Sequence, residues 1–246
     1  MRKLRQEVDV SISTVTHDID AIKREFYRYK GEALVKALKK NFFDAYYVES
    51  CDEAKELLHS LIPDGSIIGV GDSHSFYQLD MEDSLKARGC RLIPNTAALN
   101  LHGYNSPDYG YVKAPTRDQA REILADYLTS DVFVLSANAI TMEGEIVNVD
   151  GVGNRIAGSL YGADRIIMVV GVNKIVQNEE EARSRIANIA APMNKIKYGE
   201  VCASVLTGKC ADCNAQNRFC NITTIIHKKP IESDYHIVVV GEELGF

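Results

Sequence analysis

The strongest constraint on the fold is an alternation of short apolar runs with amphipathic helical segments along most of the chain. The apolar runs predict strands over residues 43–48, 66–70, 91–93, 131–135, 145–149, 165–170 and 235–240. Apolar residues at helical spacing predict helices over residues 17–40, 52–61, 76–88, 116–128, 152–161 and 179–190. This alternation is typical of a mainly parallel sheet flanked by helices. We therefore expect an α/β fold, in which residues 66–93 form one β-α-β unit.

The length fits one domain. A chain of 246 residues can bury a substantial core, so we expect a single domain over residues 1–246. Within it, residues 1–42 would form an N-terminal helical segment, interrupted at Gly31, and residues 200–222 a cysteine-rich loop. Residues 100–114 are rich in Gly, Asn, Pro and Tyr, which predicts a long ordered loop near the site.

Charge and composition argue against several classes of function. The net charge of −6 offers no general attraction to nucleic acid or to anionic lipid. No apolar run approaches the length of a membrane span, so no membrane insertion is expected. The first eight residues lack the apolar stretch of a signal peptide, which predicts a cytoplasmic protein. The sequence therefore favours a small-molecule ligand or substrate over nucleic acid or lipid.

A glycine-containing turn leads from the strand at 66–70 into the next helix. Free backbone N–H groups at such a turn favour a phosphate or carboxylate, which makes Gly71 and Ser73 candidate ligand-binding residues. The turn matches neither a dinucleotide-binding fingerprint nor a P-loop. The alternative is a strand-to-helix turn in which Ser73 or Ser75 only caps the helix.

Residues 136–155 carry a dense set of polar side chains directly after an apolar strand. Glu143-Gly144 predicts a tight hairpin turn. A structural interpretation leaves the Asn and Asp side chains to turns and helix caps. A functional interpretation gathers them with an arginine around one pocket at the strand ends: Asn138, Asn148, Asp150, Asn154 and Arg155.

Four of the six cysteines lie close together, as Cys202, Cys210, Cys213 and Cys220. Their spacing, C-x7-C-x2-C-x6-C, would let four thiolates reach one zinc ion or one iron–sulfur cluster. Disulfides are disfavoured in a cytoplasmic protein. The spacing therefore predicts a metal site, and the alternative is a loop of reduced thiols.

Three stretches resemble the lactate-utilization (LUD, DUF162) family: "SANAITMEGEIVNVDGVGNRIAGSLYGADRIIMVVGVNKIV", "TGKCADCNAQNRFCN" and "LIPDGSIIGVGDSHSF". The resemblance implies a fold like that of the NagB/RpiA/CoA-transferase group and a link to lactate oxidation beside iron–sulfur partner subunits. It also favours a [4Fe-4S] cluster over zinc at the four cysteines. The family's turn commonly reads Gly-Gly-Ser, whereas this chain adds a carboxylate there at Asp72.

Three functions from different classes remain open. The chain is a subunit or accessory of a system that oxidises lactate or another 2-hydroxy acid; or a stand-alone enzyme of the CoA-transferase or sugar-phosphate-isomerase kind; or a ligand-binding module without chemistry. In the enzyme, Glu143 or Asp150 would act as nucleophile or base, while Arg155 and Lys174 neutralise a small anionic metabolite. A homo-oligomer is compatible with all three.

Overall fold

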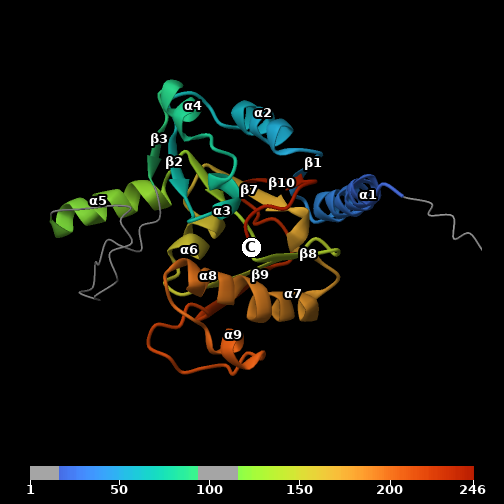
Figure 1. The fold of residues 1–246 in the computed structure, drawn as a ribbon. Helices are drawn as coiled ribbons and strands as arrows, with labels where there is room; N and C mark the ends of the chain where they lie inside the picture. Colours follow the sequence, from blue (N-terminus) through green and yellow to red (C-terminus); the bar gives the residue numbers. More distant parts are fainter. Residues whose placement is uncertain (1–16, 94–115) are drawn as a thin grey trace, which may run out of the picture.

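A computed structural model describes residues 17–93 and 116–246, and Figure 1 shows its fold. Its main sheet has six strands in the order β1-β10-β7-β4-β2-β3, and every neighbouring pair is parallel. The strands are β1 (Asp44–Val48), β2 (Ile67–Val70), β3 (Arg91–Ile93), β4 (Val132–Leu135), β7 (Arg165–Gly171) and β10 (Asp234–Val240). The predicted α/β fold with a parallel sheet is confirmed.

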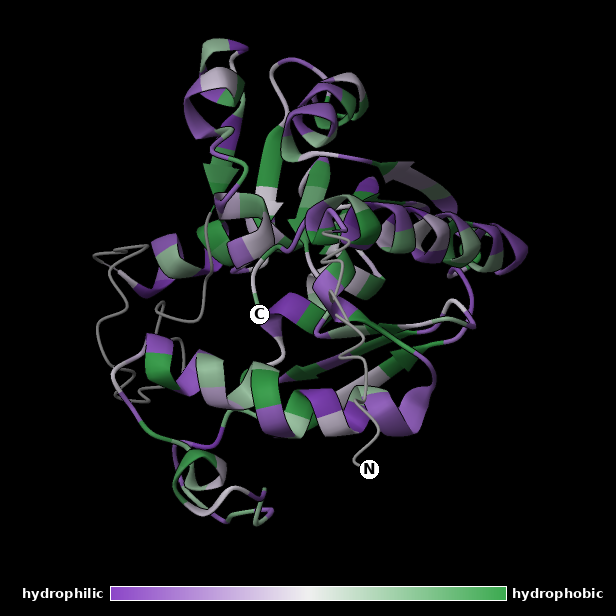
Figure 2. Ribbon diagram, turned by 45° about the vertical axis from the view of Figure 1, so that its right-hand side comes forward, coloured by the Kyte–Doolittle hydropathy of each residue, from purple (hydrophilic) through white to green (hydrophobic). Residues whose placement is uncertain are grey.

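Helices cover both faces of this sheet. They are α1 (Ile19–Lys40), α2 (Cys51–Leu61), α3 (His74–Tyr77), α4 (Glu82–Ala87), α5 (Arg117–Leu128) and α6 (Asn154–Leu160). Side chains alternate along β10: Tyr235, Ile237 and Val239 enter the core that α1 and α5 cover, and Val238 and Val240 enter the core under α2 to α4. In Figure 2 the main strands are mostly hydrophobic and the helices alternate hydrophobic and polar residues, as burial of one face requires.

A second, smaller sheet was not predicted, although its hairpin was. Its four strands run in the order β8-β5-β6-β9: β5 (Ala139–Thr141), β6 (Ile146–Asp150), β8 (Ile175–Val176) and β9 (Ile222–Ile226). One face adds Ile140, Ile146 and Ile226 to the core on the α1 side of the main sheet. The other face packs Ala139 and Val147 against α7 (Glu179–Arg185). Two of these strands are too short or too polar to stand out in the sequence.

Three helix predictions need correction. Gly31 does not interrupt α1; a Cβ there would lie 2.4 Å from the Tyr47 ring, so glycine allows the helix to approach β1. The helix expected over 76–88 is two short helices, separated near Asp80, which has φ of 50°. The helix expected over 179–190 continues as a π-helical turn (Ile186–Ala190) and α8 (Ala191–Lys197).

The remaining elements frame the site. A 3₁₀ turn (Val172–Lys174) follows β7, and α9 (Ala203–Thr207) is the one helix within the predicted cysteine-rich loop at 200–222. The rest of that loop has no regular structure before β9 begins. The loop predicted over residues 100–114 lies outside the described residues.

Candidate functional site

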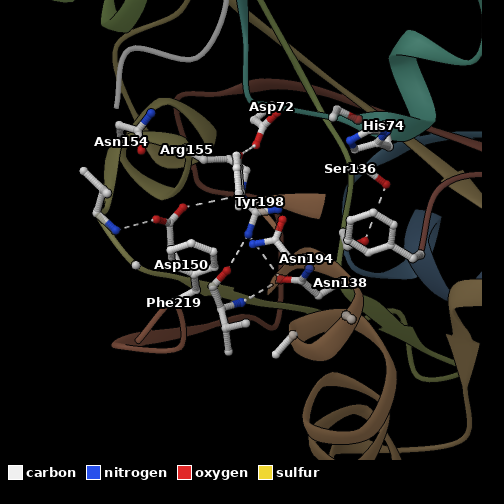
Figure 3. A pocket seen from close by; sticks show the side chains of 18 of the residues that line it. Asp72, His74, Ser136, Asn138, Asp150, Asn154, Arg155, Asn194, Tyr198 and Phe219 are labelled. Carbon is white, nitrogen blue, oxygen red and sulfur yellow. Dashed lines mark hydrogen bonds and ion pairs between the residues drawn. The ribbon is translucent and has the colours of Figure 1, made fainter. Parts of the chain in front are cut away.

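The carboxyl ends of neighbouring strands of the main sheet open into a cavity of about 140 Å³, here called the strand-exit cavity. Strand ends of parallel sheets are the usual place for such sites. Of the residues predicted to bind ligand or to act in catalysis, the cavity is lined by Ser73, Asn138, Asp150, Asn154, Arg155 and Lys174. Figure 3 shows how most of them face one space. The structure therefore brings these six residues together at one cavity.

Arg155 links the hairpin residues into one network. Its guanidinium pairs with Asp150 at 3.4 Å, donates to Asn138 Oδ1 at 3.2 Å, and donates to the Val149 carbonyl. Asp150 Oδ1 accepts from the backbone N–H groups of Val152 and Gly153, both at 2.9 Å. Both carboxylate oxygens of Asp150 are thus held by fixed donors.

Two asparagines hold the start of β5 against β6. Asn138 N–H donates to Asn148 Oδ1, and Val149 N–H donates to Asn138 Oδ1, both at 2.8 Å. Asn148 is only 1% exposed and does not line the cavity. Its role here is structural, whereas Asn138 both supports the hairpin and faces the cavity.

Two other predicted residues lie outside the cavity wall. Gly71 contributes by having no side chain, because a Cβ there would lie 3.0 Å from Arg155 Cγ. Glu143 lies at the far tip of the hairpin, where its carbonyl accepts from the Asn41 side chain at 2.8 Å, and its side chain is exposed. The structure does not bring Glu143 to the strand-exit cavity.

Lys174 is buried, at 3% exposure, on the wall of the cavity. Its ammonium donates to the hydroxyls of Ser75 at 2.9 Å and Ser136 at 3.1 Å. Within the described part of the chain it pairs with no carboxylate. Burial, with Arg185 and Arg155 nearby, lowers the pKa of Lys174 to about 7.

Other cavity residues were not among the predicted site residues, although the sequence shows the carboxylate of Asp72 at the glycine turn. Asp72 accepts from Lys197 at 2.6 Å and from the Tyr198 hydroxyl at 2.7 Å, so its charge is paired. Ser136 follows β4 directly, and the strand-exit argument applied to Asn138 would have found it. Phe246 also lines the cavity. No sequence signal placed the last residues of the chain beside β2 and β4.

All four predicted metal ligands line a second cavity of about 180 Å³, here called the cysteine cavity. The thiols are free of disulfides. Arg218 ties the loop together by donating to the carbonyls of Cys213 at 2.9 Å and Cys220 at 3.0 Å. Val149 and Ala191 line both cavities, so the two share a wall.

As placed, the four sulfurs are not arranged as the ligands of one zinc ion would be. Four thiolates around zinc stand about 3.8 Å apart, given ~2.3 Å bonds and tetrahedral geometry. Among the described residues, no three of the four sulfurs all lie within 4.8 Å of one another.

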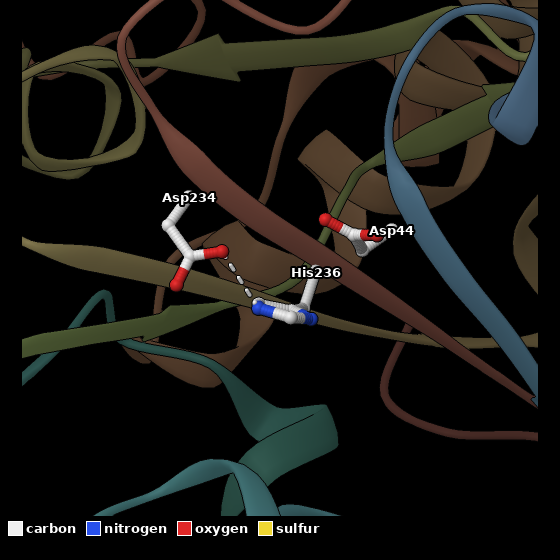
Figure 4. Close-up of side chains that lie close together, drawn as sticks. All are labelled: Asp44, Asp234 and His236. Carbon is white, nitrogen blue, oxygen red and sulfur yellow. Dashed lines mark ion pairs between the residues drawn. The ribbon is translucent and has the colours of Figure 1, made fainter.

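Within the described ranges, the one group of three possible ligands with atoms within 4.8 Å of one another is Asp44, Asp234 and His236 (Figure 4). These residues lie at the amino ends of β1 and β10, away from the strand exits. Arg165 pairs with Asp234 at 2.6 Å and His236 pairs with it at 2.9 Å. Burial works to raise the pKa of Asp234, but Arg165 and His236 outweigh it and lower the pKa. The Arg165 guanidinium already supplies a cation for Asp234.

Across residues 17–93 and 116–246, every helix is too short or too polar to cross a membrane.

Comparison with known proteins assigns the family. A DUF162 family protein from Deinococcus radiodurans matches with 14% identity and a TM-score of 0.43, over 88% of this chain and 98% of that one. No curated protein matches the chain. The family model described as the LUD domain matches residues 31–240. The chain therefore belongs to the LUD domain family.

Proposed function

We propose that the strand-exit cavity binds a small carboxylate of the 2-hydroxy-acid class, and that the protein is a subunit or accessory of a system that oxidises lactate or a related acid. Membership of the LUD domain family supports a role related to lactate utilization. The observation that carries the proposal is the buried Lys174, which lines the cavity without a carboxylate partner in the described part of the chain.

Within the described residues, two cations beside the cavity have no carboxylate partner. Arg155 is paired with Asp150 and Lys197 with Asp72. Lys174 donates to two hydroxyls, and Arg185 donates to the backbone carbonyls of Asn138 and Asn173. Burying an unpaired cation is unfavourable, and an anion held beside it relieves that penalty. A ligand carboxylate near Lys174 would supply the missing charge.

Size and polarity favour a small hydroxylated acid. The cavity of about 140 Å³ lies well below the ~300–1,000 Å³ of sites for drug-sized ligands. Asp72 Oδ1, in a residue of the cavity wall, is buried and has no hydrogen-bond partner in the described residues. A ligand hydroxyl could donate to it once the cavity wall opens at Asp72.

An enzyme that uses Asp150 as nucleophile or base has less support. A general base needs an oxygen free to take a proton from the substrate. Two backbone N–H groups hold one oxygen of Asp150, and Arg155 holds the other. These contacts favour a positioning role for Asp150, in which it orients Arg155 towards the cavity.

The four cysteines are proposed to hold a metal centre, with a [4Fe-4S] cluster preferred over zinc. Support for a metal centre comes from the shared cavity and the absence of disulfides among these residues. The preference for a cluster follows from the family resemblance, which implies iron–sulfur partner subunits. The shared wall would bring such a centre close to the bound acid. Iron–sulfur subunits of an oxidation system are then the expected partners, and co-purification from the native host tests that association.

Ligand binding can be tested by thermal unfolding with a panel of small acids. L-lactate, glycolate and pyruvate should raise the midpoint of unfolding in a concentration-dependent manner, because they bind only the folded state. Lactamide is the matched neutral control and should have no effect. Lys174→Met should abolish the response, whereas Lys36→Met, on the exposed face of α1, should keep it. Equal responses to lactate and lactamide would contradict the proposal.

A further inference from the structure

Three polar side chains meet beside the strand-exit cavity in a way that anion binding does not require. Ser75, Ser136 and Lys174 follow β2, β4 and β7, which are adjacent in the main sheet. Lys174 Nζ lies 2.9 Å from Ser75 Oγ and 3.1 Å from Ser136 Oγ, and the two hydroxyl oxygens are 3.1 Å apart. All three side chains are buried.

We propose that Ser136 is a nucleophile activated by Lys174, so that the cavity catalyses acyl transfer from an ester or thioester of a small acid. Ser136 and Lys174 both line the cavity, where an acyl group can reach them, while Ser75 stands behind them. Serine–lysine pairs are a known variant of the nucleophile–base arrangement. This activity goes beyond the anion binding proposed above.

Hydrogen-bond directions select Ser136 over Ser75. The Ser75 hydroxyl has a carbonyl acceptor, Leu244 O, at 3.2 Å, which can take its hydrogen. Its oxygen then remains an acceptor for the lysine. Ser136 has its nearest backbone acceptor, Ala137 O, at 3.5 Å, the outer limit for a hydrogen bond. The Ser136 proton is therefore the one available to a neutral Lys174.

The neutral form of Lys174 is accessible because its surroundings oppose its charge. Arg185 and Arg155 are nearby, burial is nearly complete, and no described carboxylate pairs with it. The backbone at Gly245 packs directly against Ser75 and Lys174. A Cβ at Gly245 would lie 2.9 Å from Ser75 Oγ and 3.1 Å from Lys174 Nζ. Glycine at 245 allows the backbone to shield the amine from water.

The proposed acyl transfer needs no group beyond the protein, its substrate and water. Ser136 Oγ gives its proton to Lys174 Nζ and forms a bond to the acyl carbon. The bond to the alkoxide or thiolate breaks, and the departing group takes the proton from Lys174. Water then attacks the acyl-serine with Lys174 as base, which releases the acid and restores Ser136. Asn138 and Arg155 line the same cavity and offer N–H donors to the oxyanion.

The test uses the full chain with p-nitrophenyl acetate, a small activated ester. Wild-type protein should release about one equivalent of p-nitrophenolate in a burst, and peptide mass spectrometry should place the acetyl group on Ser136. Ser136→Ala should lower the acylation rate at least about 100-fold, as loss of a nucleophile with its base does. Ser60→Ala, on the exposed surface of α2, is the matched control and should not change the rate.

Lys174→Arg separates this proposal from the proposed function. Arginine keeps the positive charge but does not act as a base, so this variant should lose acylation and still respond to lactate. Ser75→Ala should slow acylation without moving the acetyl group, and Ser75→Thr should restore the rate, as expected of a positioning residue. Acetylation elsewhere, or a wild-type rate equal to that of Ser136→Ala, would overturn the proposal whether or not lactate binds.

Discussion

The strand-exit cavity and the cysteine cavity share a wall but differ in how their polar groups are held. In the first, Arg155, Asp150 and Asn138 are fixed by one another and by backbone groups at the ends of strands. In the second, the four thiols line a cavity without a comparable network, and Cys210 is exposed. Arg218 donates to two carbonyls of the loop, and Ser204 donates to Cys202 Sγ at 3.3 Å.

The difference indicates two ways of making a site. The strand-exit cavity is preorganised by the fold, so the proposed acid would have little to rearrange on binding. The cysteine cavity has its four thiols on one wall, but not in bonding geometry for zinc. The proposed metal would set the final arrangement of this loop, because metal binding supplies folding free energy to such loops.

The largest effect should follow removal of cysteine ligands. Protein purified without oxygen should contain iron and sulfide, with a broad absorption band near ~400 nm, or one equivalent of zinc without colour. Cys210→Ser or Cys213→Ser should lower the metal content from full occupancy to near zero, because each removes a thiolate ligand. Elemental analysis and absorption spectroscopy measure the loss.

Cys51 and Cys90 provide the matched controls, since both lie outside the cysteine cavity. Cys90→Ser or Cys51→Ser should leave the metal content unchanged. The metal-site proposal would be wrong if anaerobically prepared protein contains neither iron nor zinc and the Cys210→Ser and Cys213→Ser variants are as stable as the parent.

The second-largest effect should be a pH dependence of the free energy of unfolding that arises from Lys174. Because folding lowers the pKa of Lys174 from its unfolded value to about 7, the unfolded chain binds more protons between those values. The free energy of unfolding should therefore rise by about 2–3 kcal/mol from about pH 7 to about pH 9 through this group. Lys174→Met should abolish that rise and stabilise the protein at about pH 7 by about 2–4 kcal/mol.

Urea denaturation of both proteins across this pH range measures the difference, with Lys36→Met as the control for loss of a surface charge. Parallel pH profiles for wild type and Lys174→Met would show that Lys174 is charged in the folded state throughout, and the unpaired-cation argument would fail.

The sequence predicts the parts of this structure that depend on local pattern. The parallel sheet, the hairpin and the polar residues at strand ends follow from periodicity and turn chemistry. The second sheet does not, because β8 is two residues long and β9 exposes Ile222 and Thr223, so neither shows a strand pattern. The packing of Leu244 and Gly245 on Ser75 and Lys174 is also a long-range contact that no local pattern encodes.

Catalytic assignments were harder to predict than the location of the site. Glu143 and Asp150 looked equivalent as acidic residues of one hairpin, yet they lie at its opposite ends. Ser75 and Lys174 are 99 positions apart, so only the strand order brings them together. Residue types at strand exits could be listed from the sequence, but the strand order was needed to choose among them.

A smaller effect is expected at the arginine of the preorganised cavity. Arg155→Ala leaves the 8%-exposed Asp150 side chain without its cation, although two backbone N–H groups still hold it. We expect the free energy of unfolding to fall by about 1–3 kcal/mol in the absence of ligand. Arg155→Ala should also weaken carboxylate binding if Arg155 faces the acid. Urea denaturation and ligand titration of the same variant separate the two effects.

The smallest effect should come from the corresponding arginine of the cysteine cavity. Arg218 pairs with the exposed Asp212 and bonds to two loop carbonyls. Exposed ion pairs contribute little to stability, so Arg218→Ala should destabilise the metal-free protein less than Arg155→Ala does. The same variant should weaken metal retention during dialysis against a chelator. If Arg218→Ala destabilises the metal-free protein more than Arg155→Ala does, the cysteine cavity is the more firmly held of the two.

The most direct test of the account is whether the strand-exit cavity takes up a proton when it binds an acid. Lys174 is mostly neutral in the free protein at about pH 8 and should be protonated beside a bound carboxylate. Calorimetric titration of L-lactate at that pH, in two buffers of different ionisation enthalpy, measures the uptake. We expect uptake approaching one proton per lactate for wild type and none for Lys174→Met. Lactate binding without proton uptake, or equal uptake by both proteins, would contradict this expectation.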